Sequence, residues 1–223
     1  MLFRSSDDIF RGRSNYNQTV YGTWDLSLKE IKKRADGQSG VGHVKGAQAA
    51  IQILHICAFY HHSNISRDIF QSAAEESHRY VVDGEVANEL PQAINSLNCN
   101  LLTLDNDGHW DDFIFGKGVI VLLSFSLIKK ESAEILSFHP LVHSWSREQL
   151  SLCEQQRMYE IGSMVLSCAI PKRLMSYDYA LRQLIFPHIK ANEFYGDQMR
   201  LKKKYYDDKY ENFGLVMSEN GDW

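Results

Sequence analysis

Apolar positions from Val20 onward recur mostly at intervals of three and four residues, the spacing of a helix with one buried face. The first such stretch, 20–33, predicts a helix, and the glycine-rich segment 34–46 that follows predicts a loop. Residues 1–18 are polar and have no apolar period, so we expect a disordered lead-in there. Ordered structure is therefore predicted to begin near Val20.

Three further helices are predicted before the middle of the chain. The stretch 47–62 has an apolar stripe typical of a core helix, and His61 and His62 stand at its end, where polar side chains can cap exposed carbonyls. The stretches 67–77 and 91–97 predict two shorter helices. The first half of the chain is thus predicted to be helical.

The pattern changes after a turn predicted at 105–108. Apolar residues over 113–123 predict one more helix. Residues 126–131 and 135–138 then predict two short strands joined by a turn at 132–134. The two strands and their turn are predicted to form a β-hairpin.

A helix is predicted to follow the hairpin directly. Pro140 suits its first turn, where the missing N–H leaves no bond unmade, and the buried side is predicted to comprise Leu141, Val142, Trp145 and Leu152. A helix, a hairpin and a second helix on a helical base are typical of a winged-helix module.

The C-terminal part predicts helices at 177–185 and 192–219, with a break at Pro187. The last helix carries part of the pattern that opens a tetratricopeptide repeat, with aromatic or apolar substitutes at Tyr210, Phe213, Gly214, Met217 and Gly221. The fold class expected is therefore mainly α: a helical bundle with a winged-helix module, leading into the start of a tetratricopeptide repeat.

The domain division that follows has four parts. We expect a disordered lead-in at 1–18, a helical plus winged-helix domain at 19–152, a helical linker region at 153–204, and a truncated first repeat at 205–223.

The composition indicates in which compartment the protein lies and which partners it can have. The 223 residues are 44% hydrophobic, enough for a real core, and their net charge of −4 gives no positive field for nucleic acid. No stretch approaches a signal peptide or a membrane span. The four cysteines are widely spaced, which favours buried thiols over disulfides or zinc. We expect a cytoplasmic protein that does not bind a membrane.

The segment SFHPLVHSW is the main candidate for chemistry. His139 and His143 are four residues apart, a spacing that can serve a metal, but Pro140 replaces the glutamate of the H-E-x-x-H pattern. Acid–base or nucleophilic chemistry would need a Ser, Cys or Asp held close to a histidine, and the sequence by itself does not supply that geometry. Two alternatives stay open. His139 stands at a helix N-terminus, where it could contact a phosphate, or it caps its own helix while His143 packs at the surface.

Several segments resemble one known family. TVYGTWDLSL, ILHICAFYHHSNISRDIF, LLSFSLIKKE, SFHPLVHSW and LIFPHI resemble, in that order, the region behind the nucleotide-binding module of fungal NLR-like proteins. That family consists of STAND NTPases of the NB-ARC type that end in tetratricopeptide arrays. The resemblance covers about residues 19–223.

The resemblance implies a role for one tripeptide. Phe138, His139 and Pro140 look like the MHD motif of NLR winged-helix domains, with Leu141 and Val142 following as in M-H-D-L-L. In that family the histidine contacts the β-phosphate of ADP and helps to hold the closed, inactive form. Phe138 replaces methionine, and Pro140 replaces an aspartate that stabilises the closed state.

The resemblance also indicates what the chain lacks. The glycine-rich segment around Lys45 does not match a P-loop, because Gly46 stands where that motif needs Ser or Thr. We therefore expect no catalytic or metal site and no cofactor in this chain, with ADP or ATP only in a separate nucleotide-binding domain.

The first functional hypothesis is a non-catalytic regulatory and scaffolding segment of an NLR-like switch, a fragment lacking its NTPase domain. Its partners would be a nucleotide-binding domain in cis or in trans and tetratricopeptide repeats. The alternative is a winged-helix DNA-binding module. This hypothesis is weaker, because DNA binding needs several basic residues. The helix after the hairpin has only Arg147, and the hairpin, which would be the wing, has only Lys129 and Lys130.

Overall fold

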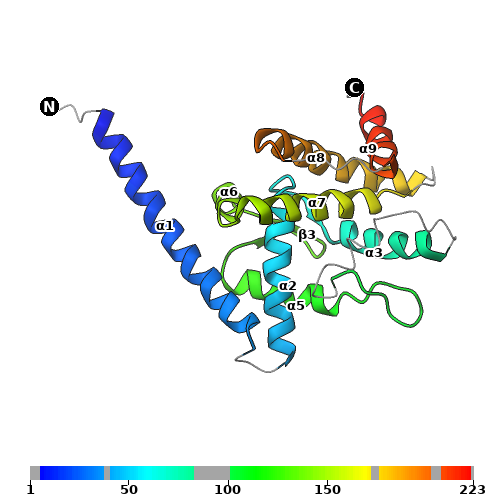
Figure 1. Ribbon diagram of the computed structural model, residues 1–223, viewed down its shortest axis with the longest axis horizontal. Helices are drawn as coiled ribbons and strands as arrows, with labels where there is room; N and C mark the ends of the chain where they lie inside the picture. Colours follow the sequence, from blue (N-terminus) through cyan, green and yellow to red (C-terminus); the bar gives the residue numbers. More distant parts are fainter. Residues whose placement is uncertain (1–5, 38–40, 83–100, 172–175, 202–206, 222–223) are drawn as a thin grey trace.

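The computed structural model describes the backbone of residues 6–37, 41–82, 101–171, 176–201 and 207–221. Side chains are described for residues 21–37, 43–76, 101–171, 178–201 and 211–221. These residues form a mainly helical fold with a small three-stranded antiparallel sheet (Figure 1), which confirms the expected fold class at that level. The helix predicted at 91–97 lies outside the described residues.

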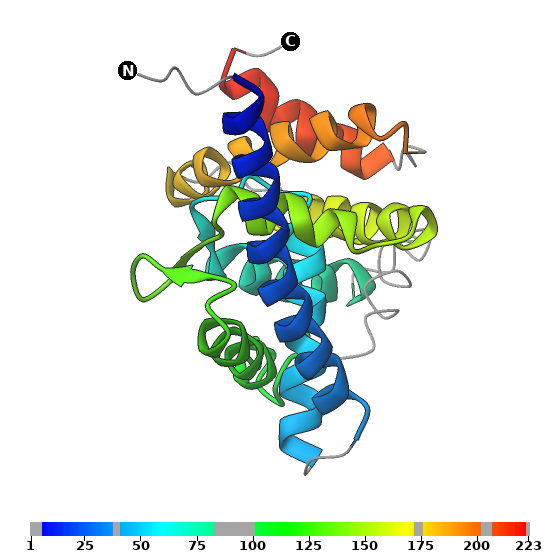
Figure 2. The same ribbon diagram turned by 90° about the vertical axis from the view of Figure 1, so that its left-hand side faces the viewer.

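The chain opens with a long helix, α1 (Ser6–Ala35), whose last part packs on α2 while the rest extends away from the body (Figures 1 and 2). It therefore includes most of the stretch 1–18, for which the sequence predicts disorder. Once a helix is anchored, each added residue gains one backbone hydrogen bond. The polar residues can therefore extend the helix without an apolar stripe.

The second helix, α2 (Val41–Cys57), is shifted toward the N-terminus from its predicted position. It begins inside the predicted loop, and Gly46 lies within the helix, where an added Cβ would come 3.2 Å from the Lys117 Cβ. It ends five residues before His62, because a tight turn at residues 58–60 follows it. The prediction that His61 and His62 cap this helix is therefore wrong.

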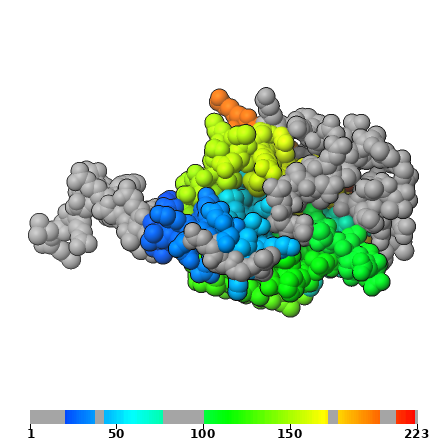
Figure 3. Space-filling view, turned by 60° about the horizontal axis from the view of Figure 1, so that its bottom comes forward, coloured from blue at the N-terminus to red at the C-terminus, as the bar shows by residue number. Residues whose placement is uncertain are grey.

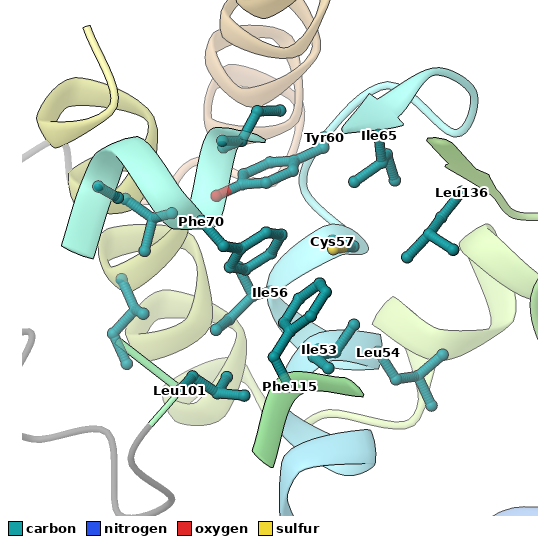
Figure 4. Packing of buried hydrophobic residues seen from close by; sticks show 14 of the residues in the cluster. Ile53, Leu54, Ile56, Cys57, Tyr60, Ile65, Phe70, Leu101, Phe115 and Leu136 are labelled. Atoms are coloured by element: carbon teal, nitrogen blue, oxygen red, sulfur yellow. The ribbon is translucent and has the colours of Figure 1, made fainter. Parts of the chain in front are cut away.

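The core forms where buried side chains of α2, α3 (Arg67–Val82) and α5 (Phe113–Ser124) meet (Figure 4). The rings of Phe70 and Phe115 lie 4.8 Å apart between them. A Cβ at Gly118 would lie 2.9 Å from the Ala49 Cβ, so α5 touches α2 there almost backbone to backbone. Figure 3 shows the face on which α2 and α5 lie side by side. The predicted helix at 113–123 and the predicted turn at 105–108 are both confirmed.

The sheet joins one strand from the first half of the chain to the hairpin. Strand β1 (Ile65–Ser66) pairs with β3 (Ile135–Ser137), which pairs with β2 (Lys129–Lys130), all antiparallel. The predicted hairpin is present (Figure 2), but its strands are shorter than expected. Residues 126–128 instead form the turn after α5, where the Leu127 N–H donates to the Leu122 carbonyl.

The helix after the hairpin is two helices. Pro140 opens α6 (Pro140–Glu148) as predicted, but α6 stops there, and a capping box between Ser151 and Glu154 starts α7 (Leu152–Cys168). Leu152 is therefore 75% exposed in the first turn of α7, and its predicted burial in α6 is wrong. Helix α7 is buried along its second half.

Two more helices cover α7: α8 (Ser176–Gln198) and α9 (Asp207–Glu219) (Figure 1). The break predicted at Pro187 is wrong, because α8 runs through it. The proline ring faces solvent, while His188 and Ile189 beside it are fully buried and hold the helix in place. The interruption falls later, near Arg200 with its φ of 54°, so the predicted helix 192–219 is split.

The remaining sequence predictions concern the cysteines, membrane spans and the division into domains. Cys57 and Cys168 are buried thiols as expected, whereas Cys153 is exposed, and Cys99 lies outside the described residues. No helix in the described part of the chain is both long and apolar enough to cross a bilayer. The division into domains stays a prediction.

Candidate functional site: a groove lined by His62 and His139

A groove of about 590 Å³ lies between the hairpin, the turn after α5 and the segment that follows α2. Its floor is apolar and includes Leu127, Ile128 and Phe138. Its polar residues are His62, Ser63, Ser126, Lys129, Glu131, Ser137 and His139. The predicted tripeptide of Phe138, His139 and Pro140 thus forms one wall of the groove.

The three residues of the tripeptide have different roles. Phe138 is buried, and its N–H donates to the His62 carbonyl over 2.7 Å. His139 is exposed and caps α6, since its Nδ1 accepts from the Leu141 N–H at 3.2 Å. Pro140 is the first helical residue. Because Nδ1 accepts, the neutral His139 ring carries its proton on Nε2 and can donate it to a ligand.

The hairpin supplies a charged pair at the rim. Lys129 Nζ contacts both carboxylate oxygens of Glu131 at 3.1 Å, and the Ser137 hydroxyl donates to one of them at 2.7 Å. The Ser137 hydrogen bond, followed by the one from Lys129, lowers the pKa of Glu131. Glu131 therefore stays ionised and occupied by its hairpin partners.

His143 does not join His139, because it points into the protein. It is 2% exposed, its Nε2 lies 2.9 Å from the Cys57 carbonyl, and its Nδ1 lies 2.8 Å from an Arg147 nitrogen. Burial, and then the charge of Arg147, lower the pKa of His143 to about 3. The alternative in which His143 packs at the surface is wrong, although its companion statement, that His139 caps α6, is confirmed.

A metal site is not formed by these residues. The two histidines of the HxxxH spacing face opposite directions, one to the groove and one to the core. Within the described residues, no group of three or more His, Cys, Asp or Glu side chains is placed to hold a metal ion.

The remaining candidate residues lie where they serve packing. Leu141 is half-buried, whereas Val142 and Trp145 are buried, and the Trp145 indole N–H donates to Asp25 of α1 at 2.8 Å. Of the repeat-like residues, Phe213 is buried, Gly214 and Met217 are partly buried, and Gly221 has a φ of 68° after the end of α9. The Tyr210 side chain is outside the described residues.

Sequence reasoning missed His62 as a groove residue. Its placement depends on where α2 ends and on the backbone hydrogen bond to Phe138, two features that involve distant parts of the chain. Burial, then the neighbouring His61 and then His139, lower the pKa of His62. The dipeptide of two histidines was the only available signal, and it does not say which ring faces the groove.

Comparisons of the chain with protein-family models, with curated proteins and with solved structures find no match. The functional argument therefore depends on the groove and on the elements that build it.

Proposed function

We propose that this chain is a non-catalytic regulatory and scaffolding segment of an NLR-like nucleotide-dependent switch, with His139 as its phosphate-contacting residue. The observation that carries the proposal is the position of His139. It is an exposed imidazole at the N-cap of α6, on the wall of a groove. A helix N-terminus favours anions, and the Nε2–H of His139 adds a donor beside it.

The arrangement of elements supports the proposal. In chain order, helix α2, strand β1, helices α3 and α5 and then the hairpin have the succession that a winged-helix module would have, and the sheet order is β1-β3-β2. The tripeptide then falls where the last strand meets the next helix. In an NLR-like protein this position faces the nucleotide-binding domain, which would supply ADP or ATP in cis or in trans.

Pro140 has a consequence for the switch. It serves the first turn of α6 but brings no carboxylate to the groove. We infer that the closed form is stabilised by His139 alone at this position, and that it is less stable than a closed form held by a His-Asp pair.

The C-terminal helix supports a scaffolding role. Phe213 and Val216 of α9 are buried against the preceding helices, and Asn212 donates to the Ser167 carbonyl of α7 at 3.0 Å. We infer that α9 begins a tetratricopeptide array, whose next repeat would stack on it. We also propose that the partners are a nucleotide-binding domain and tetratricopeptide repeats, and that the protein is cytoplasmic.

The DNA-binding alternative becomes weaker still. In a helix-turn-helix arrangement the second helix enters the major groove, and if this chain is a winged-helix module that helix would be α5, not the helix after the hairpin. It has one basic residue, Lys117, whose Nζ lies 4.6 Å from the Phe113 ring centre, beside the exposed Ile120. A surface of this kind offers few contacts to phosphates.

The test uses this chain joined to an NB-ARC nucleotide-binding domain and loaded with a fluorescent ADP. We expect His139→Ala to speed ADP dissociation about two- to tenfold, the value of one hydrogen bond. His109→Ala, at another exposed histidine, is the control and should release ADP at the wild-type rate. Equal rates for His139→Ala and wild type would remove the phosphate-contacting role.

A further inference from the structure

His62 is a second histidine in the lining of this groove, beside His139. The Phe138 N–H donates to the His62 carbonyl, so the backbones that carry the two histidines run side by side. Both side chains line the same groove, and the charge of His139 acts on His62. His61 is not among the residues that line the groove, and its Nδ1 lies 3.0 Å from the Ser63 hydroxyl.

Among the described residues that line the groove, neither imidazole has an anionic partner. Glu131 is the carboxylate among the lining residues, and its oxygens accept from Ser137 and Lys129. Protonating both histidines would therefore add two positive charges to the groove beside the Lys129–Glu131 pair. A multivalent anion in the groove would remove that repulsion.

We propose that the groove binds a diphosphate through both His62 and His139, with Lys129 adding charge at the rim, and that binding takes up a proton on the histidine pair. This inference rests on the proposed function, which needs His139 only. The new elements are His62 as a second contact and the coupling to pH. The chemical class of ligand is the diphosphate end of a nucleoside diphosphate.

The direction of the pH dependence follows from the charges. The anion prefers the protonated pair, so it binds best at low pH, and affinity falls as pH rises and the imidazoles lose their protons. The titratable or charged groups that face His62 are His61 beside it, His139 and His143 from α6, and Lys129 and Glu131 from the hairpin. Glu131 is ionised throughout this range, so the histidines dominate the change.

The first experiment needs no substitution. Imidazole proton resonances of the full chain are titrated with pH by NMR, with and without inorganic pyrophosphate and in the absence of metal. We expect pyrophosphate to raise the pKa of His62 by about one unit, because an opposite charge nearby favours the protonated form. The exposed His109 is the control, and pyrophosphate should leave its imidazole resonances unchanged. An unchanged pKa of His62 would overturn the proposal.

The second experiment measures pyrophosphate affinity for variants at pH 6. His62→Gln and Lys129→Gln should each weaken binding, His62→Gln by about tenfold, the value of one charge-assisted hydrogen bond. Lys130→Gln is the matched control, since the strand turns Lys130 away from this groove toward a second one beside α5. Wild-type affinity for His62→Gln would overturn the inference.

The two proposals can fail separately. If His139→Ala releases ADP faster in the fused protein while His62→Gln binds pyrophosphate like wild type, the proposed function stands and the role of His62 is wrong. If the pKa of His62 responds to pyrophosphate while ADP release is insensitive to His139, the groove binds diphosphate but the switch role is wrong.

Discussion

His139 and His143 lie one helical turn apart and have opposite environments. The first is exposed at the groove, and the second is enclosed between Cys57 and Arg147. A third histidine, His188, is fully buried on α8, and its Nε2 lies 3.0 Å from the Asn64 carbonyl. Burial is the main cause that lowers the pKa of His188 to about 4 and that of His143 to about 3. These two histidines are therefore neutral in the folded protein at neutral pH.

Buried neutral histidines should make the protein acid-sensitive. The unfolded chain binds protons near the ordinary histidine pKa of 6.5, whereas the folded chain does not. The stability that depends on these neutral histidines is thus fully present above pH 6.5 and is lost as pH falls toward 4. The free energy of unfolding should drop by up to about 1.4 kcal/mol per pH unit for each buried histidine.

Urea unfolding at several pH values measures this slope. His188→Gln should give a shallower slope between pH 6.5 and 4 than wild type, whatever its stability at pH 7.5. His43→Gln changes an exposed histidine and should keep the wild-type slope. An unaltered slope in His188→Gln would show that His188 is protonated in the folded protein.

At the scale of elements, the crossing of α2 and α5 positions the hairpin, because the chain passes from α5 directly into the turn that lines the groove. The two helices approach closely at Gly118, whose neighbours include Ala49 and the Ala50 backbone nitrogen. A glycine inside a helix costs about 1 kcal/mol relative to alanine. Close packing offsets that cost at Gly118, which explains why a sequence with two glycines in this stretch still forms a helix.

Gly116 and Gly118 make a matched pair for testing the crossing. Gly118→Ala would place a Cβ 2.9 Å from Ala49, Ala50 and Ile53, so we expect it to destabilise the fold. The expected loss is about 1–3 kcal/mol, as for overpacked cores. Gly116→Ala meets no atom within 4 Å and should stabilise by up to about 1 kcal/mol. Thermal or urea unfolding gives both values, and equal effects would mean that α5 does not touch α2 at this point.

At the scale of the whole molecule, one hydrophobic cluster extends from Leu28 of α1 to Val216 of α9. The C-terminal helix is attached to this body by polar contacts as well. Arg182 of α8 is 3% exposed, and its Nε donates to the Glu219 carboxylate of α9 at 2.8 Å. A buried guanidinium needs such a partner, since its desolvation is otherwise uncompensated.

Removing the charge of Glu219 should therefore loosen α9. We expect Glu219→Gln to lower the free energy of unfolding by about 2 kcal/mol, and Arg182→Met combined with Glu219→Gln to recover part of that loss. The control is Glu30→Gln, which breaks an exposed pair with Arg34 and should change stability by less than about 0.5 kcal/mol. A double variant less stable than Glu219→Gln would contradict this account.

The sequence by itself determined the local elements. The apolar period predicts helices at 20–33 and 113–123, alternation and turn residues predict the hairpin, and Pro140 marks the start of α6. These features depend on neighbouring residues, whose backbone preferences and spacing are visible in the chain itself. The position of His139 as the cap of α6 belongs with them.

The tertiary structure decided the environment of each functional group. The burial of His143, the continuation of α8 through Pro187 and the meeting of His62 with His139 depend on contacts between segments that are far apart in sequence. Spacing along one helix says which residues share a face, but not whether that face meets protein or water. Desolvation and long-range packing set that environment, and with it the charge and the donors that each histidine can offer.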